Sequence, residues 1–133
     1  MNLELALRMC EAAVKQAVRE GTLVSVAVVD AGGHLVAFQR MDDAEISGPD
    51  LASGKAYTSV AHRMSTADLA PLVAPGGALY GLAGDRYVCF GGGIPLREQG
   101  ESGRIVGAVG VSGGTVAQDV ACAEAAAALW DRA

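Results

Sequence analysis

Residues 107–119, GAVGVSGGTVAQD, join an apolar segment to a glycine turn and then to the start of a helix. The apolar segment extends over residues 104–112 and is apolar on both faces, which is typical of a strand covered on each side. Thr115 and Gln118 have the spacing of a capping box, in which each side chain bonds the other residue's backbone N–H. The sequence therefore predicts a covered strand that leads directly into an alanine-rich helix over residues 116–130.

The glycines at this junction allow two interpretations. Gly107 and Gly110 permit a covered strand to pack closely against its neighbours. Ser112, Gly113 and Gly114 are better ligand candidates, because free N–H groups and the positive end of a helix attract a carboxylate. The spacing of a phosphate loop or a dinucleotide fingerprint is absent, so no phosphate specificity follows.

The elements outside this junction predict the fold class. In the first half of the chain the pattern indicates a helix over 3–19, with Asn2 as its cap and Gly21 at its end, and then a hairpin of strands 23–30 and 34–41. A helix over 49–63 and a short helix opened by Ser65 follow. A loop over 74–85, a strand at 86–90 and an extended segment at 94–98 complete the part before the junction. Local hairpins with segregated helices favour an α+β fold with a largely antiparallel sheet over a doubly wound parallel one.

Composition excludes several function classes. The 133 residues carry a net charge of −5 with a pI near 4.8, so a nucleic-acid or anionic-membrane partner is not expected. Charges interrupt residues 1–21, which leaves no signal peptide or membrane span, and a cytoplasmic location is expected. The three cysteines have no metal-ligand spacing, and no metal site is predicted with confidence.

Four segments taken together resemble one known family. They are VSVAVVDAGGHLVAFQRMDDA (24–44), GKAYTSVAHRMST (54–66), FGGGIPLRE (90–98) and IVGAVGVSGGTVAQD (105–119). In this order they are similar to the GlcG/HbpS-like family, also called the haem-degrading domain family, which includes PduO-type C-terminal domains. The resemblance implies a single domain over 1–133, a profilin-like three-layer fold with a central antiparallel sheet flanked by helices, homo-oligomers from dimer to octamer, and haem as a ligand.

Asp30, Arg40 and Lys55 are the candidate ligand-binding or catalytic residues, and the resemblance implies that they line or support the pocket. Asp30 can instead cap the N–H groups of its own glycine turn. Arg40 offers a planar fork and Lys55 a point charge for a carboxylate. Gly92 and Gly93 either let backbone N–H groups approach a ligand or form a bulge before Pro95.

A haem iron needs a side chain such as His, Met, Cys or Tyr. His34, in the hairpin turn, and His62, on the helix that carries Lys55, are the two candidates. Few rings are available to stack on a porphyrin, since aromatic residues make up 5% of the chain. Among them are Tyr57, Tyr80, Tyr87 and Phe90.

Three functions remain open from the sequence. The first is a small-ligand-binding protein for haem or a related tetrapyrrole. The second is an enzyme acting on a small carboxylate or carbonyl metabolite, and the third is a structural accessory module. The alanine-rich helix over 116–130 is apolar around more than one stripe, so we expect part of it, with the glycine loop 75–84, to be buried between subunits.

Overall fold

The computed structural model describes residues 1–82, 84–99 and 103–132. Its four strands are β1 (Ser25–Asp30), β2 (Leu35–Arg40), β3 (Gly93–Arg97) and β4 (Ile105–Ser112), and they form one sheet in the order β2-β1-β4-β3. Every neighbouring pair is antiparallel. The β1–β2 hairpin confirms the predicted turn, and β4 lies inside the sheet, as its double-sided apolar pattern predicts.

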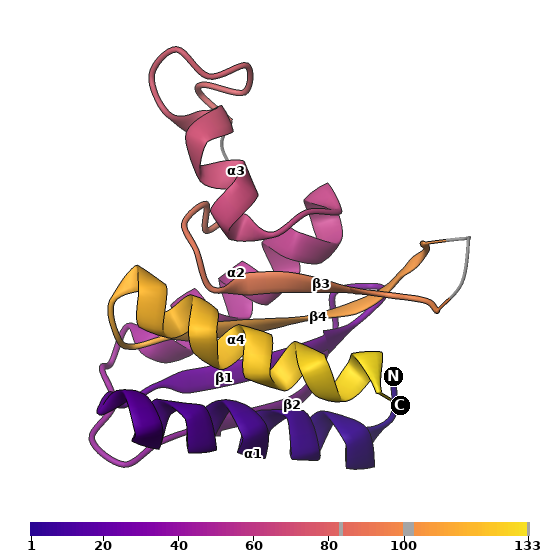
Figure 1. The fold of residues 1–133 in the computed structure, drawn as a ribbon. Coiled ribbons are helices and arrows are strands. Elements are labelled where there is room, and N and C mark those ends of the chain that lie inside the picture. The colour runs from indigo at the N-terminus through magenta and orange to yellow at the C-terminus, as the bar shows by residue number, and fades with distance from the viewer. Residues whose placement is uncertain (83, 100–102, 133) are drawn as a thin grey trace.

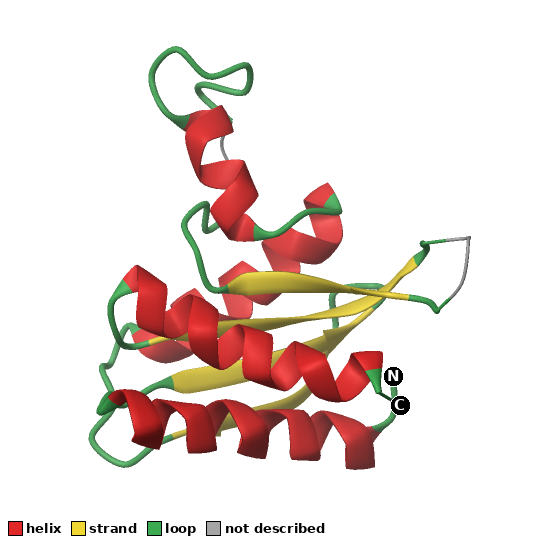
Figure 2. Cartoon of the chain, in the orientation of Figure 1, coloured by secondary structure: helices red, strands yellow, loops and turns green. Residues whose placement is uncertain are grey.

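Helices cover both faces of this sheet (Figures 1 and 2). Helices α1 (Leu3–Glu20) and α4 (Val116–Asp131) lie side by side on one face, and α2 (Gly48–His62) covers the other. Helix α3 (Thr66–Val73) and the loop after it project from the body. The predicted α+β class with helices flanking an antiparallel sheet is therefore confirmed.

Local side-chain chemistry sets the helix ends. The Asn2 side chain accepts a 2.8 Å hydrogen bond from the Leu5 N–H, and α1 stops at Gly21, whose φ of 69° is the left-handed conformation that glycine adopts without strain. Both bonds of the capping box between Thr115 and Gln118 are present at the start of α4. These caps confirm the boundaries that the sequence predicts.

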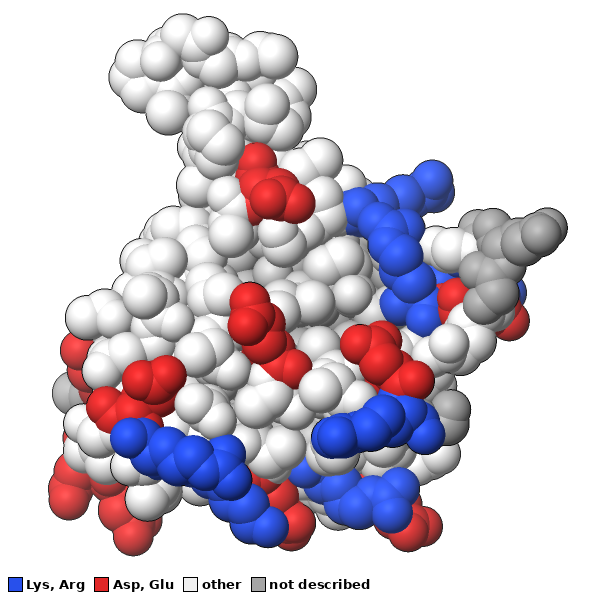
Figure 3. Space-filling view, in the orientation of Figure 1, with Lys and Arg blue, Asp and Glu red and all other residues white. Residues whose placement is uncertain are grey.

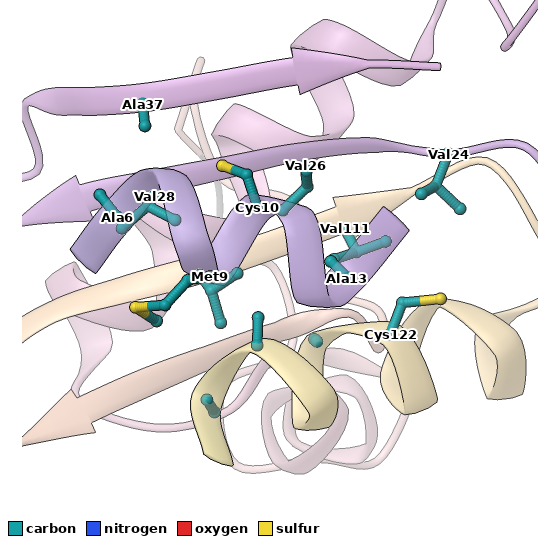
Figure 4. Close-up of a cluster of buried hydrophobic side chains, with 14 of the residues drawn as sticks. Ala6, Met9, Cys10, Ala13, Val24, Val26, Val28, Ala37, Val111 and Cys122 are labelled. Carbon is teal, nitrogen blue, oxygen red and sulfur yellow. The ribbon is translucent and has the colours of Figure 1, made fainter. Parts of the chain in front are cut away.

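The main core lies between the sheet and the α1–α4 layer (Figure 4). It packs Met9 and Cys10 of α1 and Cys122 of α4 against valines of β1 and β4. All three cysteines are free, and burial raises the pKa of the Cys10 and Cys122 thiols to about 11. These thiols behave as small apolar side chains of the core.

On the opposite face of the sheet, α2 packs closely against the strands because the residues between them are glycine and alanine. A Cβ at Gly110 of β4 would meet the backbone of Ala52 and Ala56 in α2. Ala27 and Ala108 complete this contact with small side chains. The close-packing interpretation of Gly110 is thus confirmed, and it fixes α2 at short range over the sheet.

The strand predicted at 86–90 is wrong. This segment has no regular secondary structure and packs along α2. The Val88 N–H donates to Thr58 Oγ1 at 2.9 Å, and a Cβ on Gly54 would meet the Val88 side chain. Its backbone bonds a helix side chain instead of a neighbouring strand. A short apolar run indicates burial, but a strand also needs a partner strand.

Candidate functional site

Lys55, a predicted ligand residue, is fully buried beneath the glycine junctions. Its Nζ donates to the Val111 carbonyl at 2.9 Å and to Asp119 Oδ2 at 3.1 Å, and it lies 4.7 Å from the centre of the Phe90 ring. A lysine with 0% exposure needs such partners. The ammonium group therefore ties α2 to the end of β4 and the first turn of α4.

The Asp119 carboxylate occupies the group of backbone N–H donors at Gly113 and Gly114, which the sequence predicts as ligand contacts. The Gly114 N–H donates to Asp119 Oδ1 at 2.8 Å, and the Gly113 N–H also faces this carboxylate. The positive end of α4 and the glycine turn thus hold an internal carboxylate. Ser112 lies buried beside them at the end of β4.

Burial opposes the charge on both members of this pair. It lowers the pKa of Lys55, and the attraction of Asp119 offsets that effect only in part. Burial likewise raises the pKa of Asp119 against the opposing effects of the Gly114 hydrogen bond and of Lys55. Each group depends on the other, because an isolated buried charge is strongly destabilising.

The glycine run before β3 also packs against the protein's own chain. Gly92 has a φ of +134°, and a Cβ there would lie 2.8 Å from Lys55 Nζ. The Gly93 N–H donates to Thr66 Oγ1 at 2.8 Å, and a Cβ on Gly91 would contact Val116. The run therefore forms a tightly packed wall around Lys55.

Asp30 and Arg40 lie at opposite ends of the β1–β2 hairpin, and among the described residues no hydrogen bond or ion pair joins either of them to Lys55. Asp30 Oδ1 accepts from the N–H groups of Gly32 and His34 at 2.9 and 3.0 Å, as a turn cap does. Arg40 pairs with Ser25 at the other end of β1, about 16 Å along the strand at 3.3 Å per residue. The structure does not bring the three predicted residues into one pocket.

Arg40 instead lines a separate hollow of about 510 Å³. The hollow lies between α1 and the end of β2, and its other lining residues are Val14, Leu23, Gln39, Met41 and Asp42. The Met41 sulfur already accepts the Val24 N–H at 3.3 Å.

A second group of side chains gathers around the C-terminal half of α2. The Tyr57 and Tyr87 rings stack with centroids 6.2 Å apart, and the His62 ring meets Tyr87 edge-on at 4.6 Å. The guanidinium of Arg86 lies 3.6 Å from the centre of the Tyr57 ring. We call Tyr57, His62, Arg86 and Tyr87 the aromatic cluster.

His62 Nε2 is the unusual atom of this cluster. It is buried and has no hydrogen-bond partner among the described residues. Buried polar atoms are nearly always hydrogen-bonded, so an imidazole nitrogen without a partner is a functional candidate. Within the described residues no three His, Cys, Asp or Glu side chains converge as a metal site.

His34, the other predicted iron ligand, is exposed on the hairpin turn. The turn packs on the aromatic cluster, since a Cβ on Gly33 would lie 2.9 Å from Tyr57 Cδ1. Tyr57, Tyr87 and His62 were each visible in the sequence. The sequence gives no local signal for Arg86, because its contact with Tyr57 joins segments 29 positions apart.

These observations define a three-layer α+β protein with an aromatic and histidine cluster beside one helix. The family described as "Haem degrading protein HbpS-like" matches residues 1–128. The chain belongs to this HbpS-like family. None of the helices within the described residues has the length and apolar character that crossing a bilayer requires.

Individual relatives agree with this assignment. The chain is 42% identical over 129 residues to an uncharacterized 15.0 kDa protein of the dhaT-dhaS intergenic region of Citrobacter freundii, covering 95% of this chain and 89% of the relative. It is 40% identical over 124 residues to the corrinoid adenosyltransferase PduO of Citrobacter freundii, covering 91% of this chain but 36% of PduO. The crystal structure of a PduOC:Heme complex matches with a TM-score of 0.89 and 37% identity, covering 97% of this chain and 94% of that one.

Proposed function

We propose that this protein binds haem or a closely related tetrapyrrole at the aromatic cluster, with His62 Nε2 as the iron ligand. The observation that carries the proposal is the buried Nε2 without a hydrogen-bond partner. The haem in the related PduOC complex supports it.

The side chains around His62 fit such a ligand in type. An imidazole nitrogen is a common axial ligand of haem iron, and the Tyr57 and Tyr87 rings offer apolar faces for a porphyrin. Arg86 provides a guanidinium for a propionate, which it would bind while remaining stacked on Tyr57. Bound haem would supply an iron centre, whereas the chain itself supplies the ligand, the apolar faces and the counter-charge.

Titration of the purified protein with haemin tests this proposal. The wild type is expected to give a saturable shift of the Soret band, and His62→Ala is expected to weaken binding by about tenfold or more through loss of the iron ligand. His34→Ala is the matched control, because His34 is exposed on the adjacent turn, and it is expected to bind as the wild type does. Identical, non-saturating absorption in all three proteins would refute haem binding, and equal binding in the wild type and both variants would refute the role of His62.

We also propose that the protein assembles as a homo-oligomer through its projecting arm, defined as residues 66–82. The arm holds a single charged residue, Asp68, and Figure 3 shows its surface as almost entirely uncharged. Leu79 and Tyr80 near its tip are 39% and 66% exposed. An uncharged apolar projection of this kind is typical of a surface that another subunit covers.

Light scattering at micromolar concentration tests assembly. The wild type is expected to have a mass several times 13.4 kDa. A Leu79→Glu, Tyr80→Glu variant is expected to dissociate, because it places charges in the contact. Val18→Glu changes an apolar side chain of α1 that is as exposed as Tyr80, and it is expected to keep the wild-type mass. A monomeric wild type would contradict the proposal, as would dissociation by the α1 variant alone.

A further inference from the structure

A basic hollow lies at the C-terminal end of α2, where Val60, Ala61 and Arg63 line it. Its volume is about 710 Å³, and polar atoms make up most of its lining. In Figure 3, Lys and Arg side chains gather at the right, beside the connection between β3 and β4. The lining residues are Ala31, Val60, Ala61, Arg63, Arg97, Gly103, Arg104 and Ile105. Three arginines thus meet in a chain whose net charge is −5.

Arg97 is held in place by the backbone. Its Nη1 donates to the Gly103 carbonyl at 3.0 Å, and its Nη2 donates to the Arg63 carbonyl at 2.8 Å. A guanidinium has five N–H donors, so these two bonds orient its plane and leave further donors for another acceptor. A fork that is fixed in advance loses little conformational freedom when it binds an anion.

The other two arginines differ in their partners. Arg104 forms an ion pair with Glu98 at 3.2 Å. Arg63 ends α2 in the left-handed conformation, with a φ of 57°, and its guanidinium makes no ion pair with any described residue. Arg63 and Arg97 each carry one positive charge, and no described acidic side chain forms an ion pair with either of them. The hollow therefore suits an anion that carries two negative charges.

The same hollow has an apolar part. Val60 of α2, Ala31 of the hairpin turn and Ile105 of β4 lie along it. Inorganic anions would leave this surface uncovered, whereas an organic body attached to the anionic groups would cover it.

We propose that this hollow is a binding site for a small organic dianion, either a dicarboxylate or a phosphomonoester, held by Arg63 and Arg97 with its carbon body against Val60 and Ile105. Both kinds of anion match the planar donor fork of arginine. The site is separate in its residues from the aromatic cluster and does not depend on haem binding.

Isothermal titration with succinate and with phenyl phosphate tests the site, with sodium chloride at equal ionic strength as the reference. At least one dianion is expected to bind the wild type saturably, and Arg63→Gln is expected to weaken that binding by about tenfold or more. Arg19→Gln is the matched control, since Arg19 is an exposed arginine of α1, which covers the face of the sheet opposite to α2. It is expected to bind as the wild type does.

Arg97→Lys provides a second variant, because it keeps the charge but loses the planar fork. Circular dichroism confirms that each variant is folded before titration. Weaker binding by folded Arg97→Lys supports a role for the fork. Preference for succinate identifies a dicarboxylate, and preference for phenyl phosphate identifies a phosphomonoester. Absence of saturable binding by either dianion would overturn the proposal, as would equal weakening by Arg63→Gln and Arg19→Gln.

Discussion

The two halves of α2 treat their polar side chains in opposite ways. In the first half Lys55 is sealed, and the protein supplies both its hydrogen-bond acceptors and its counter-charge. In the second half His62 keeps a buried nitrogen without a partner among the described residues, next to two tyrosine rings. The glycine-rich motifs that mark this chain surround the first half. The glycines around Lys55 pack against the protein's own chain, so the groups of this region are paired within the protein.

The largest effect is expected from breaking the sealed pair. Lys55→Ala or Asp119→Ala is expected to lower the free energy of unfolding by about 3–5 kcal/mol, because each leaves a buried charge without its partner. The double variant Lys55→Met, Asp119→Asn removes both charges and keeps an acceptor for Gly114, so it is expected to recover most of the loss. Urea unfolding at one protein concentration measures all three.

The exposed pair of Glu4 and Arg8, 3.7 Å apart, provides the control for this prediction. Glu4→Gln is expected to cost less than about 1 kcal/mol, since water screens the pair. If the single variants at Lys55 and Asp119 were as mild as Glu4→Gln, the junction would not be the sealed structural element described above.

A smaller effect is expected from Gly110→Ala. The added methyl group would meet the backbone of α2 at Ala52 and Ala56, so overpacking is expected to cost about 1–3 kcal/mol. Gly76→Ala is the control for replacing a glycine where the added methyl group meets no neighbouring atom. Its φ is +88° with nothing within 4 Å, and only backbone strain of about 1 kcal/mol is expected. Equal costs at the two positions would show that close packing at β4 is not limiting.

Ionisation of the Cys10 and Cys122 thiols is expected to lower the free energy of unfolding by about 1 kcal/mol each by pH 10. Their pKa rises from 9.0 unfolded to about 11 folded, so the folded protein holds more protons between these values. Their contribution to stability is therefore complete below pH 9 and is lost as pH rises through 11. Lys55, whose folded pKa is lowered, acts in the opposite direction up to pH 10.5.

Comparing the wild type with Cys10→Ala, Cys122→Ala isolates the thiol contribution, because Lys55 is common to both proteins. The variant is less stable at pH 8 through lost packing, and this difference is expected to narrow by pH 10. A constant difference between pH 8 and pH 10.5 in urea unfolding would contradict the raised thiol pKa values.

The smallest effect is expected at the open half of α2. His62→Leu removes a buried nitrogen that has no hydrogen bond to lose, so stability is expected to change by less than about 1 kcal/mol. Thermal unfolding without ligand measures it. A large loss of stability would show that His62 is a structural residue, and it would remove the contrast between the two halves of the helix.

Much of the fold was predictable because its signals are local. Asn2, Gly21 and the Thr115–Gln118 capping box fix helix ends through bonds within one turn of chain. Strand β4 was recognisable from its apolar residues on both faces. Segment 86–90 was not, because its apolar pattern fits a strand while its partner, Thr58, belongs to a helix 30 residues away.

The α+β class, the family and the order of the helices and strands follow from the sequence, apart from the strand wrongly predicted at 86–90. Which polar side chains are paired within the protein depends on the tertiary structure. Lys55 and Asp119 are 64 positions apart, and no local pattern could indicate that each neutralises the other. His62, Tyr87 and Arg63, Arg97 are likewise assembled by the packing of α2 against distant segments. The sequence specifies the type of each side chain. Its burial and its hydrogen-bond or ion-pair partners depend on contacts between segments that are far apart in the sequence.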